Sequence, residues 1–537
     1  MKVSIPKTVV LCTDVFDEFM DQNNLYQIAL SDASDEEILK HFLRAQLPDA
    51  YIADFFTFFE ATRRPIAIRS SSLLEDSHYQ PFAGIYSTYM IPHLDDKYQM
   101  LQMLAAAIKS VYASVYFKDS KSYMTATSNV IDQEKMAVIL QEVVGRQYGD
   151  YYYPTVSGVL RSLNYYPIDD ETAEEGVASL ALGLGKYIVD GGQTLRVSPY
   201  HPKQVLQLSE MDLALRQTQT QFYALDMKHV SNDFQVDDGF NIAHLKVKEA
   251  DKHGSLRYIA STYDPRDQVI RDGYYEGGRK IISLCGPLLH GIFPLPELLQ
   301  MTMKYGAEGM RRPVEIELAC NIDGDPVADE DGKMHVGGEL YLLQIRPIVD
   351  SKQMLDEDLS AIPDDQCLLR SHNSLGHGIS DDVTDVVYVK TDEHFTASNN
   401  PAIASEIEKI NRQFLDNNKN YVLIGPGRWD SSDYWLGIPV KWPHISGARL
   451  IVESGLKNYR VDPSQGTHFF QNLTSFGVGY FTINDFNGDG VYQKQVLDAM
   501  PAVEETQFVR HVRFDKPLKL MMDGMKQEGV LLLPDMN

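Results

Sequence analysis

The spacing of hydrophobic residues predicts several helices in this chain. Apolar side chains recur at helical intervals over residues 97–117, as in an amphipathic helix that packs on a core. Ser34-Asp35-Glu36-Glu37 has the pattern of a capping box, and apolar residues follow it at helical spacing. Asn400-Pro401 is predicted to start another helix, which runs through Asn417.

Short apolar runs between these segments predict strands. They lie at residues 65–68, 136–144, 421–424, 449–452 and 477–483. The first run leads into Arg69-Ser70-Ser71-Ser72, which we interpret as a polar loop. Helices and strands thus mix along the chain, and the predicted fold class is α/β (α+β).

Two later segments predict one hairpin. Residues 314–319 alternate, so that Glu315 and Glu317 share the face opposite the apolar side chains. Gln344 and Arg346 also lie two residues apart, within a mostly apolar segment. A turn-rich stretch separates the segments, and we expect them to be neighbouring strands joined by a long loop.

Composition narrows the class of protein. The chain has 537 residues, enough for two to four domains, and a formal net charge of −26. Such a surface repels phosphate backbones, which argues against nucleic acid as a partner. Four scattered cysteines fit neither a zinc site nor a disulfide framework. With no signal peptide and no long apolar run, we expect a cytoplasmic protein without membrane partners.

Candidate phosphate chemistry appears at three places. Arg69, beside serine hydroxyls, is suited to grip phosphate oxygens; a capped turn with an exposed arginine is the alternative. Gly183-Leu184-Gly185 is a second candidate, and an ordinary turn is its alternative. The third is the predicted hairpin. Glutamate and glutamine oxygens there suit Mg²⁺, and an arginine beside them would neutralise charge on a transferring group. A solvated hairpin edge is the alternative for this third candidate.

The order of these motifs resembles one family. Arg69-Ser70-Ser71-Ser72 is followed by Phe82-Ala83-Gly84-Ile85, Ser157-Gly158-Val159, the Gly183 segment, Glu315-Ile316-Glu317 and Leu342 to Ile348. This order resembles the ATP-binding domain of pyruvate phosphate dikinase and phosphoenolpyruvate synthase, over about two-thirds of the chain. The resemblance implies an ATP-grasp fold with ATP and Mg²⁺ as cofactors.

The resemblance also implies roles for single residues. Arg69 and Arg346 would bind phosphate oxygens and act in catalysis, and Glu317 and Gln344 would hold metal and nucleotide. Glu315 would support this site. The segment that contains Gln141, Glu142 and Val144 matches the strand that passes the adenine.

The chain also departs from the family pattern. It contains no Gly-Gly-Lys segment to supply a phosphate-binding lysine, and Lys7 and Lys186 are the candidate substitutes. The family's Thr-Ser-His motif is absent as well. We predict an ATP-grasp domain at residues 1–350, a linker at 351–365 and a smaller α/β domain at 366–537. That last part is too short for the family's pyruvate-binding barrel of about 250 residues.

The C-terminal part holds further candidate groups. His377 and His468 lie in polar or small-residue loops and are candidate phosphoryl acceptors, with a structural histidine as the alternative. Gly425-Pro426-Gly427-Arg428 follows a predicted strand, where its backbone N–H groups could meet an anion. Three tryptophans follow, at 429, 435 and 442, and they predict either a stacking surface or a structural core.

Three functions follow from these features. The first is an Mg²⁺-dependent kinase that passes a phosphoryl group from ATP to a histidine or to a separate small-molecule or protein acceptor. The second is an ATP-sensing regulatory module without turnover. The third is a glycan kinase similar to glucan-water dikinases, in which the tryptophans bind carbohydrate.

Overall fold

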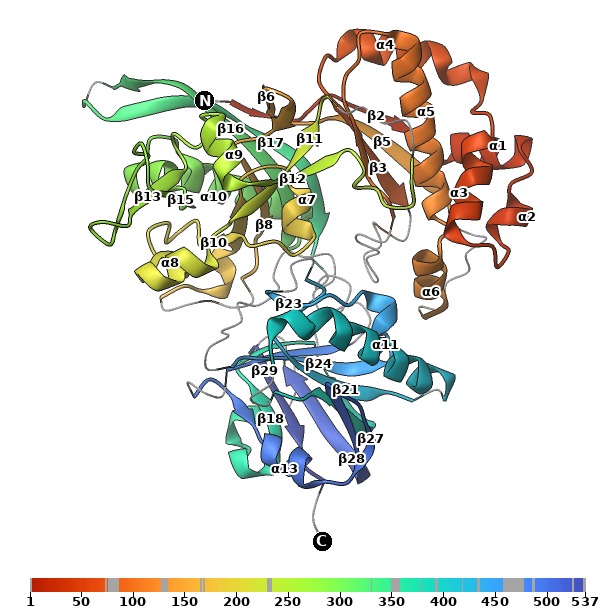
Figure 1. Ribbon diagram of the computed structural model, residues 1–537, viewed down its shortest axis with the longest axis vertical. Coiled ribbons are helices and arrows are strands. Elements are labelled where there is room, and N and C mark those ends of the chain that lie inside the picture. The colour runs from red at the N-terminus through yellow and green to blue at the C-terminus, as the bar shows by residue number, and fades with distance from the viewer. Residues whose placement is uncertain are drawn as a thin grey trace. The chain divides into compact units, whose positions relative to one another are not determined.

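A computed structural model of the chain (Figure 1) gives its architecture. It describes residues 2–72, 75, 86–126, 134–164, 167, 170–228, 234–329, 331–348, 358–376, 378–391, 395–417, 419–431, 435–456, 478–484, 488–523 and 526–534. Of the residues that the structure describes, 31% are helix and 37% are strand, which confirms the mixed α/β class. It forms two compact units. Unit 1 comprises residues 1–164, 174–189 and 193–348, and unit 2 comprises residues 165–173, 190–192 and 349–537.

The first part of unit 1 is an antiparallel sheet with helices packed on it (Figure 1). The strand order is β2 (Thr8–Leu11), β5 (Met136–Glu142), β3 (Ile66–Ser72) and β4 (Tyr89–Ile91). The helices are α1 (Thr13–Gln22), α2 (Tyr26–Ala29), α3 (Asp35–Arg44), α4 (Ile52–Ala61), α5 (Lys97–Ser114) and α6 (Lys118–Ala126). The predicted capping box forms, since the Ser34 hydroxyl accepts the Glu37 N–H at 3.3 Å.

Helix α5 is the central helix of this part. It packs against α3, α4 and the strands β3, β4 and β5. By length and composition alone, the stretch Lys97–Lys121 could cross a membrane, but 72% of its apolar window is buried inside the protein. That burial is what a core helix requires. The helix predicted over residues 97–117 is therefore confirmed, three residues shorter at its end.

The rest of unit 1 is built on a six-stranded sheet. Its strand order is β1 (Lys2–Ser4), β17 (Met334–Pro347), β16 (Val314–Ala328), β8 (Val156–Arg161), β9 (Val177–Ala181) and β10 (Leu195–Val197). Only the β1–β17 pair in this sheet is parallel. Helix α10 (Leu295–Met310) packs on β16, β17 and β8, and the apolar side chains between them form the main core of unit 1.

Two smaller sheets and three short helices complete unit 1. One sheet has the order β12 (Ile242–Lys246), β11 (Gln221–Asp226), β7 (Tyr151–Tyr153) and β6 (Arg146–Tyr148). The other has the order β14 (Val269–Arg271), β13 (Ala260–Asp264) and β15 (Arg279–Ile282). The helices are α7 (Lys186–Val189), α8 (Met211–Gln217) and α9 (Val247–Lys252).

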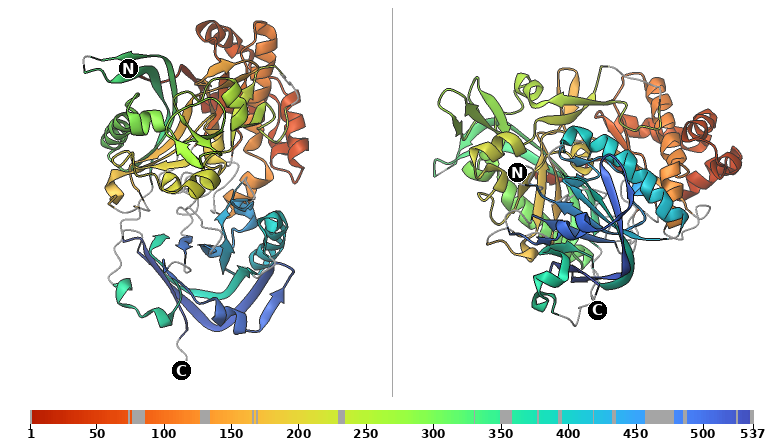
Figure 2. Two further views of the ribbon diagram at one scale, coloured as in Figure 1. Left: turned by 60° about the vertical axis from the view of Figure 1, so that its left-hand side comes forward. Right: turned by 60° about the horizontal axis from the view of Figure 1, so that its bottom comes forward.

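Unit 2 is built on one long sheet, seen from two further sides in Figure 2. The order is β19 (Asn373–Leu375), β25 (Gly479–Ile483), β24 (Ala448–Ser454), β21 (Tyr421–Pro426), β20 (Gly378–Val389), β28 (Val509–Asp523), β29 (Glu528–Leu532), β18 (Cys367–Ser371) and β26 (Val491–Tyr492), with β27 (Ala502–Glu505) paired to β28. β20, β21, β24 and β25 are parallel. Helix α11 (Asn400–Asp416) connects β20 to β21, and α13 (Lys494–Ala499) follows β26.

The long sheet of unit 2 curls, so that strands near its two ends lie close together. Strands β18 and β19 are consecutive in the chain, with only His372 between them. Yet β18 pairs with β29 and β19 pairs with β25, at opposite ends of the strand order. One chain segment therefore contributes strands near both ends of the sheet, and β26 is the last strand beyond β18. The enclosed side chains form the core of unit 2.

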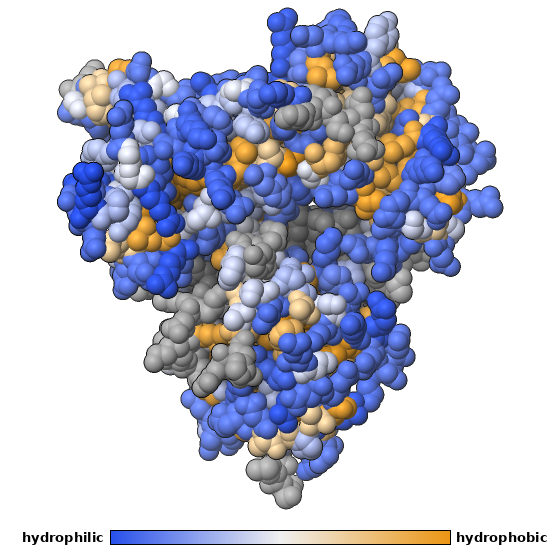
Figure 3. All heavy atoms as spheres, in the orientation of Figure 1, coloured by the Kyte–Doolittle hydropathy of each residue, from blue (hydrophilic) through white to orange (hydrophobic). Residues whose placement is uncertain are grey.

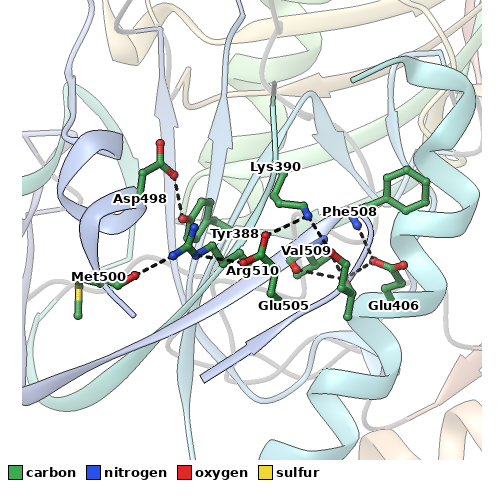
Figure 4. Close-up of polar contacts among 10 residues, drawn as sticks. Tyr388, Lys390, Glu406, Asp498, Met500, Glu505, Phe508, Val509 and Arg510 are labelled. Atoms are coloured by element: carbon green, nitrogen blue, oxygen red, sulfur yellow. Dashed lines mark hydrogen bonds and ion pairs between the residues drawn. The ribbon is translucent and has the colours of Figure 1, made fainter. Parts of the chain in front are cut away.

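Polar contacts fix the turn between β27 and β28 (Figure 4). Glu406 of α11 accepts hydrogen bonds from the Thr506 hydroxyl at 2.6 Å and from the Phe508 N–H at 3.1 Å. Lys390, just after β20, donates to Glu505 at 3.2 Å and to the Thr506 carbonyl at 2.8 Å. These contacts attach the turn to both the helix and the sheet.

The face of the molecule shown in Figure 3 is mostly hydrophilic, as the net charge of −26 leads one to expect.

Two local predictions were wrong. Arg69-Ser70-Ser71-Ser72 is not a loop but the second half of β3, where its backbone pairs with β5 residue by residue. The turn-rich stretch of the hairpin is also mostly strand, because β16 and β17 pair from Val314 to Asp323 and again at Val327 and Ala328. In both places cross-strand hydrogen bonds outweigh the weak local preference of serine, aspartate and glycine for turns.

Candidate functional site

The candidate site begins as a row of charged side chains across three strands. On β16, Glu315 lies opposite Arg346 of β17 and Arg161 of β8. Two residues further along β16, Glu317 lies opposite Gln344. The predicted pairing of these two strands is confirmed, and it brings the glutamates, the glutamine and the arginine onto one face.

A bulge in β17 shapes this face. The pairing register shifts between Glu317 and Leu318, so that β17 contains one extra residue there. As a result, the side chains of the consecutive residues Leu343 and Gln344 both lie on the same face of the sheet. Gln344 meets Glu317, while Leu343 packs beside the small apolar cluster of Val144, Ala319 and Tyr341.

Arg69 reaches this row from the other sheet of unit 1. Its Nη2 atom donates to Glu317 Oε2 at 2.6 Å and also to Gln344 Oε1. The side chains of Arg69 and Glu317 are each 18% exposed, so the pair is partly shielded from water. Arg346 Nη2 lies 3.7 Å from the other carboxylate oxygen, Glu317 Oε1. Arg69 and Arg346 therefore meet at the Glu317 carboxylate, and Gln344 joins them through its bond to Arg69.

Arg161 is a member of the row that sequence reasoning missed. Its Nε and Nη2 atoms both lie 2.7 Å from Glu315 Oε2, and both side chains are 5% exposed. A buried carboxylate needs such a partner, because an unpaired charge is costly away from water. The signal available in the sequence was an arginine at the end of the strand that starts with Val156-Ser157-Gly158.

The row carries more positive than negative charge. Arg69, Arg161 and Arg346 supply three guanidinium groups, and Glu315 and Glu317 supply two carboxylates. Guanidinium groups on a partly buried strand face suit phosphate oxygens, which they can bind in pairs. The net charge of −26 therefore does not oppose an anion at this place.

The residues that the family resemblance assigns to the adenine site lie at the end of β5 and just after it. Gln141 Nε2 donates to the Leu343 carbonyl at 3.2 Å and to Thr8 Oγ1 at 3.3 Å. Glu142 accepts a hydrogen bond from the Thr62 hydroxyl. Gln141 thus ties β5 to β2 and β17, and Glu142 ties β5 to the residue that follows α4. Val144 is buried in the apolar cluster beside the charged row.

Further polar contacts fix the sheet beside this cluster. Tyr341 donates to Glu339 at 2.5 Å and accepts from Arg64 Nη1 at 3.3 Å. Burial raises the pKa of Tyr341, and its bond to Glu339 adds to that shift. Burial also pushes the pKa of Glu339 upward, but hydrogen bonds from Lys2, Ser4 and Tyr341 outweigh it and hold that pKa at about 2.

The glycine motif has a structural role at its first position. Gly183 has φ of 92°, and a Cβ atom there would lie 2.6 Å from the Tyr223 carbonyl oxygen. Only glycine fits this position without strain. The Ser157 hydroxyl donates to the Gly183 carbonyl at 2.6 Å, which ties the motif to β8.

The lysines proposed to replace the family's phosphate-binding lysine are engaged elsewhere. Lys7 donates to the Ala61 carbonyl and lies 3.9 Å from Glu142. Lys186 forms an ion pair with Asp238 at 3.2 Å. The candidate acceptors His377 and His468 lie outside the described residues, as does Phe82-Ala83-Gly84-Ile85.

The loop at Gly425 has an internal structural role. The N–H groups of Gly427 and Arg428 bond to the carbonyls of Ser454 and Leu436, and the Trp429 N–H bonds to Glu453. The expectation that Gly427 and Arg428 offer backbone N–H groups to an anion was therefore wrong.

Two of the three tryptophans are core residues. Trp429 and Trp442 are 1% and 5% exposed, whereas Trp435 is 56% exposed. The Trp429 indole donates to the Val452 carbonyl at 3.0 Å. It packs over Gly425, where a Cβ atom would lie 2.4 Å from the ring. Trp429 and Trp442 do not contribute to an exposed stacking surface.

Metal ligands are limited in the part of the chain that the structure describes. It contains no group of three or more histidine, cysteine, aspartate or glutamate side chains placed to hold a metal ion. Glu317 and Gln344 offer two oxygen atoms that already converge on one cationic nitrogen, that of Arg69. This donor set fits Mg²⁺, which takes few protein ligands and completes its shell with phosphate and water oxygens.

Comparison with known proteins agrees with this geometry. Residues 1–364 match the family model described as pyruvate phosphate dikinase, AMP/ATP-binding domain. Over 190 residues the chain is 27% identical to the "Uncharacterized phosphotransferase YvkC" of Bacillus subtilis (strain 168). That match covers 35% of this chain and 20% of the relative, so it spans about a fifth of the relative's length. Because the family model covers more than half of the chain, the chain belongs to the family that carries the AMP/ATP-binding domain of pyruvate phosphate dikinase.

Proposed function

We propose that the chain is an Mg²⁺-dependent phosphotransferase of the dikinase family, which binds ATP in unit 1 and passes a phosphoryl group to a histidine or a separate acceptor. One observation carries this proposal. Arg69, Arg346, Glu317 and Gln344 come from three strands and two sheets, yet both arginines contact the Glu317 carboxylate and Gln344 contacts Arg69. Such convergence of cations and oxygen ligands is what a metal-bound polyphosphate requires.

In this proposal the arginines bind the phosphates. Arg69 lies on β3 and Arg346 on β17, so the two guanidinium groups can approach a triphosphate from different strands. During transfer, a bond forms between the acceptor atom and phosphorus, and the bond to the leaving phosphate oxygen breaks. Arg346 would stabilise the negative charge that this exchange leaves on the equatorial oxygens.

The metal would be held by Glu317 and Gln344. When bound, Mg²⁺ would act as a Lewis acid that neutralises the charge of the phosphate oxygens. Glu315 would not bind this Mg²⁺ ion, because its carboxylate is already bound to Arg161. Its role in the proposal is to keep Arg161 paired and the strand face in position.

The adenine would lie against the apolar cluster beside the charged row. Val144, Ala319, Tyr341 and Leu343 form this cluster. A flat base is bound well by apolar and aromatic side chains, with a few polar groups to orient it. Because the cluster adjoins Gln344 in the chain, a nucleotide lying there would direct its phosphates toward Arg69.

Incubation with Mg²⁺ and ATP labelled at its β- and γ-phosphates tests the reaction. The proposal predicts release of labelled phosphate or labelling of the protein, and the loss of both in Arg346→Met. The exposed change Glu308→Gln on α10 is the control and should leave both unchanged. If the protein binds MgATP yet releases no phosphate and acquires no label, it is an ATP-sensing module and the phosphotransferase proposal fails. If the protein does become labelled, mapping the labelled residue tests His377 and His468, which remain predictions.

A further inference from the structure

Arg69 occupies the two oxygen atoms that the proposed metal site needs. Its Nη2 atom lies 2.6 Å from Glu317 Oε2, and the same nitrogen contacts Gln344 Oε1. A Mg²⁺ ion binds carboxylate and amide oxygens at about 2.1 Å, on the same lone pairs that accept these hydrogen bonds. The guanidinium and the metal therefore cannot bind this pair of oxygens together.

We infer that Arg69 is a built-in counter-cation, which fills the metal site until the phosphates of a nucleotide draw it away. The inference rests on the proposed function and goes beyond it, because it fixes the order of binding. A divalent cation alone meets a site already neutralised by Arg69. When a cation arrives with a triphosphate, the phosphate oxygens bind the Arg69 guanidinium. Glu317 and Gln344 can then bind the cation.

The position of Arg69 makes such a move feasible. Its backbone is held by pairing with Ile139 of β5, so the strand itself stays in place. Its long side chain can swing about its own bonds, and both it and Glu317 are 18% exposed, which leaves room for solvent or a ligand to reach them. Triphosphate oxygens are strong partners for a guanidinium, since they accept two parallel hydrogen bonds and carry several charges.

The other charged groups at the site keep their places in this exchange. Arg346 lies 3.7 Å from Glu317 Oε1 and so faces the oxygen that Arg69 does not use. Arg161 is bound to Glu315. Removal of Arg69 alone should therefore expose Glu317 Oε2 and Gln344 Oε1 and leave the rest of the row intact.

Titration of the protein with Mn²⁺ in the absence of nucleotide tests this inference. The electron paramagnetic resonance signal of the free ion measures how much Mn²⁺ is bound. Mn²⁺ prefers oxygen ligands as Mg²⁺ does. The wild-type protein should bind Mn²⁺ weakly, whereas Arg69→Met should bind it at least about tenfold more tightly, because a charge-assisted competitor has gone. Arg63→Met, an exposed arginine in the loop that precedes β3, is the matched control and should bind as the wild type does.

The double variant Arg69→Met/Glu317→Gln shows whether a gain in binding comes from this site. It should return Mn²⁺ binding to the wild-type level. Thermal unfolding of each variant shows whether it is folded, and Arg69→Lys provides a second variant that keeps the charge and should not gain binding. The inference is overturned if wild-type protein binds Mn²⁺ as tightly as folded Arg69→Met does, or if the gain persists without Glu317.

This test is separable from that of the proposed function. If wild-type protein binds MgATP and Arg69→Met gains no Mn²⁺ binding, only the counter-cation inference fails. If Arg69→Met gains Mn²⁺ binding that depends on Glu317 but the wild type does not bind MgATP, the cation site stands and the proposed function fails.

Discussion

Arg69 and Glu317 are 248 residues apart in the chain, and their side chains meet at 2.6 Å between a guanidinium nitrogen and a carboxylate oxygen. The contact joins strand β3 of one sheet to strand β16 of another. It places the proposed phosphate ligand directly on the proposed metal ligand. The proposed ATP site requires this contact, because it brings the phosphate ligand and the metal ligand together.

The buried pair of Arg161 and Glu315 predicts a measurable coupling. Arg161→Met should lower the free energy of unfolding by about 3–5 kcal/mol, because it leaves the Glu315 carboxylate buried without its partner. Arg161→Met combined with Glu315→Leu should recover most of that loss, since two apolar side chains need no partner. Urea unfolding of the wild type, both single variants and the double variant measures the coupling. Additive single effects would show that the two side chains do not depend on each other.

Asp385 in unit 2 predicts a pH-dependent stability. Burial alone would raise its pKa, but contacts with His511 at 2.6 Å, Thr384 at 2.7 Å and Arg513 at 2.7 Å outweigh burial and hold the pKa at about 2. Because this pKa lies below the unfolded value of about 3.9, the ionised carboxylate stabilises the fold above that pH. The contribution, about 2 kcal/mol, is lost as the pH falls from about 4 toward 2.

Comparison of the wild type with Asp385→Asn tests this pH dependence. The difference in free energy of unfolding should be large near neutral pH and should shrink as the pH falls through that window. Urea unfolding at a series of pH values measures it. A difference that stays constant from neutral to acid pH would mean that Asp385 is not held ionised by these partners.

Replacing Trp429 and replacing Trp435 should have very different effects on stability. Trp429→Ala should destabilise unit 2 by about 3–5 kcal/mol, because the indole is buried and bonded to the Val452 carbonyl. Trp435→Ala should change stability by no more than about 0.5 kcal/mol, since that side chain is 56% exposed. Thermal or urea unfolding measures both. Equal effects would contradict the assignment of Trp429 to the core.

Parts of this structure could be read from the sequence because their signals are local. The alternation around Glu315 and Glu317 predicted a strand with both carboxylates on one face, and the structure confirms it. The capping box at Ser34 is also local, and it forms as predicted. The order of the motifs placed the first part of the chain in the right family, as the match of residues 1–364 shows.

Other features depend on contacts that no local pattern encodes. The extra residue in β17 appears only when the strand is paired, so the placement of Leu343 beside Gln344 on one face was not predictable. Arg161 was not singled out from the sequence, because only the pairing of β8 with β16 places it against Glu315. The placement of residues 367–375 near both ends of the unit 2 sheet depends on strands β25 and β29, which lie more than a hundred residues later in the chain.

Calorimetric titration of ATP in the presence of Mg²⁺ tests the central claim most directly. The wild type and the exposed control Glu308→Gln should bind MgATP with the same affinity. Glu317→Gln should bind it at least about tenfold more weakly, because the variant loses the anionic ligand of the proposed metal site. If folded Glu317→Gln binds MgATP as tightly as the wild type does, the nucleotide site is not where Arg69 and Glu317 meet, and the account is wrong.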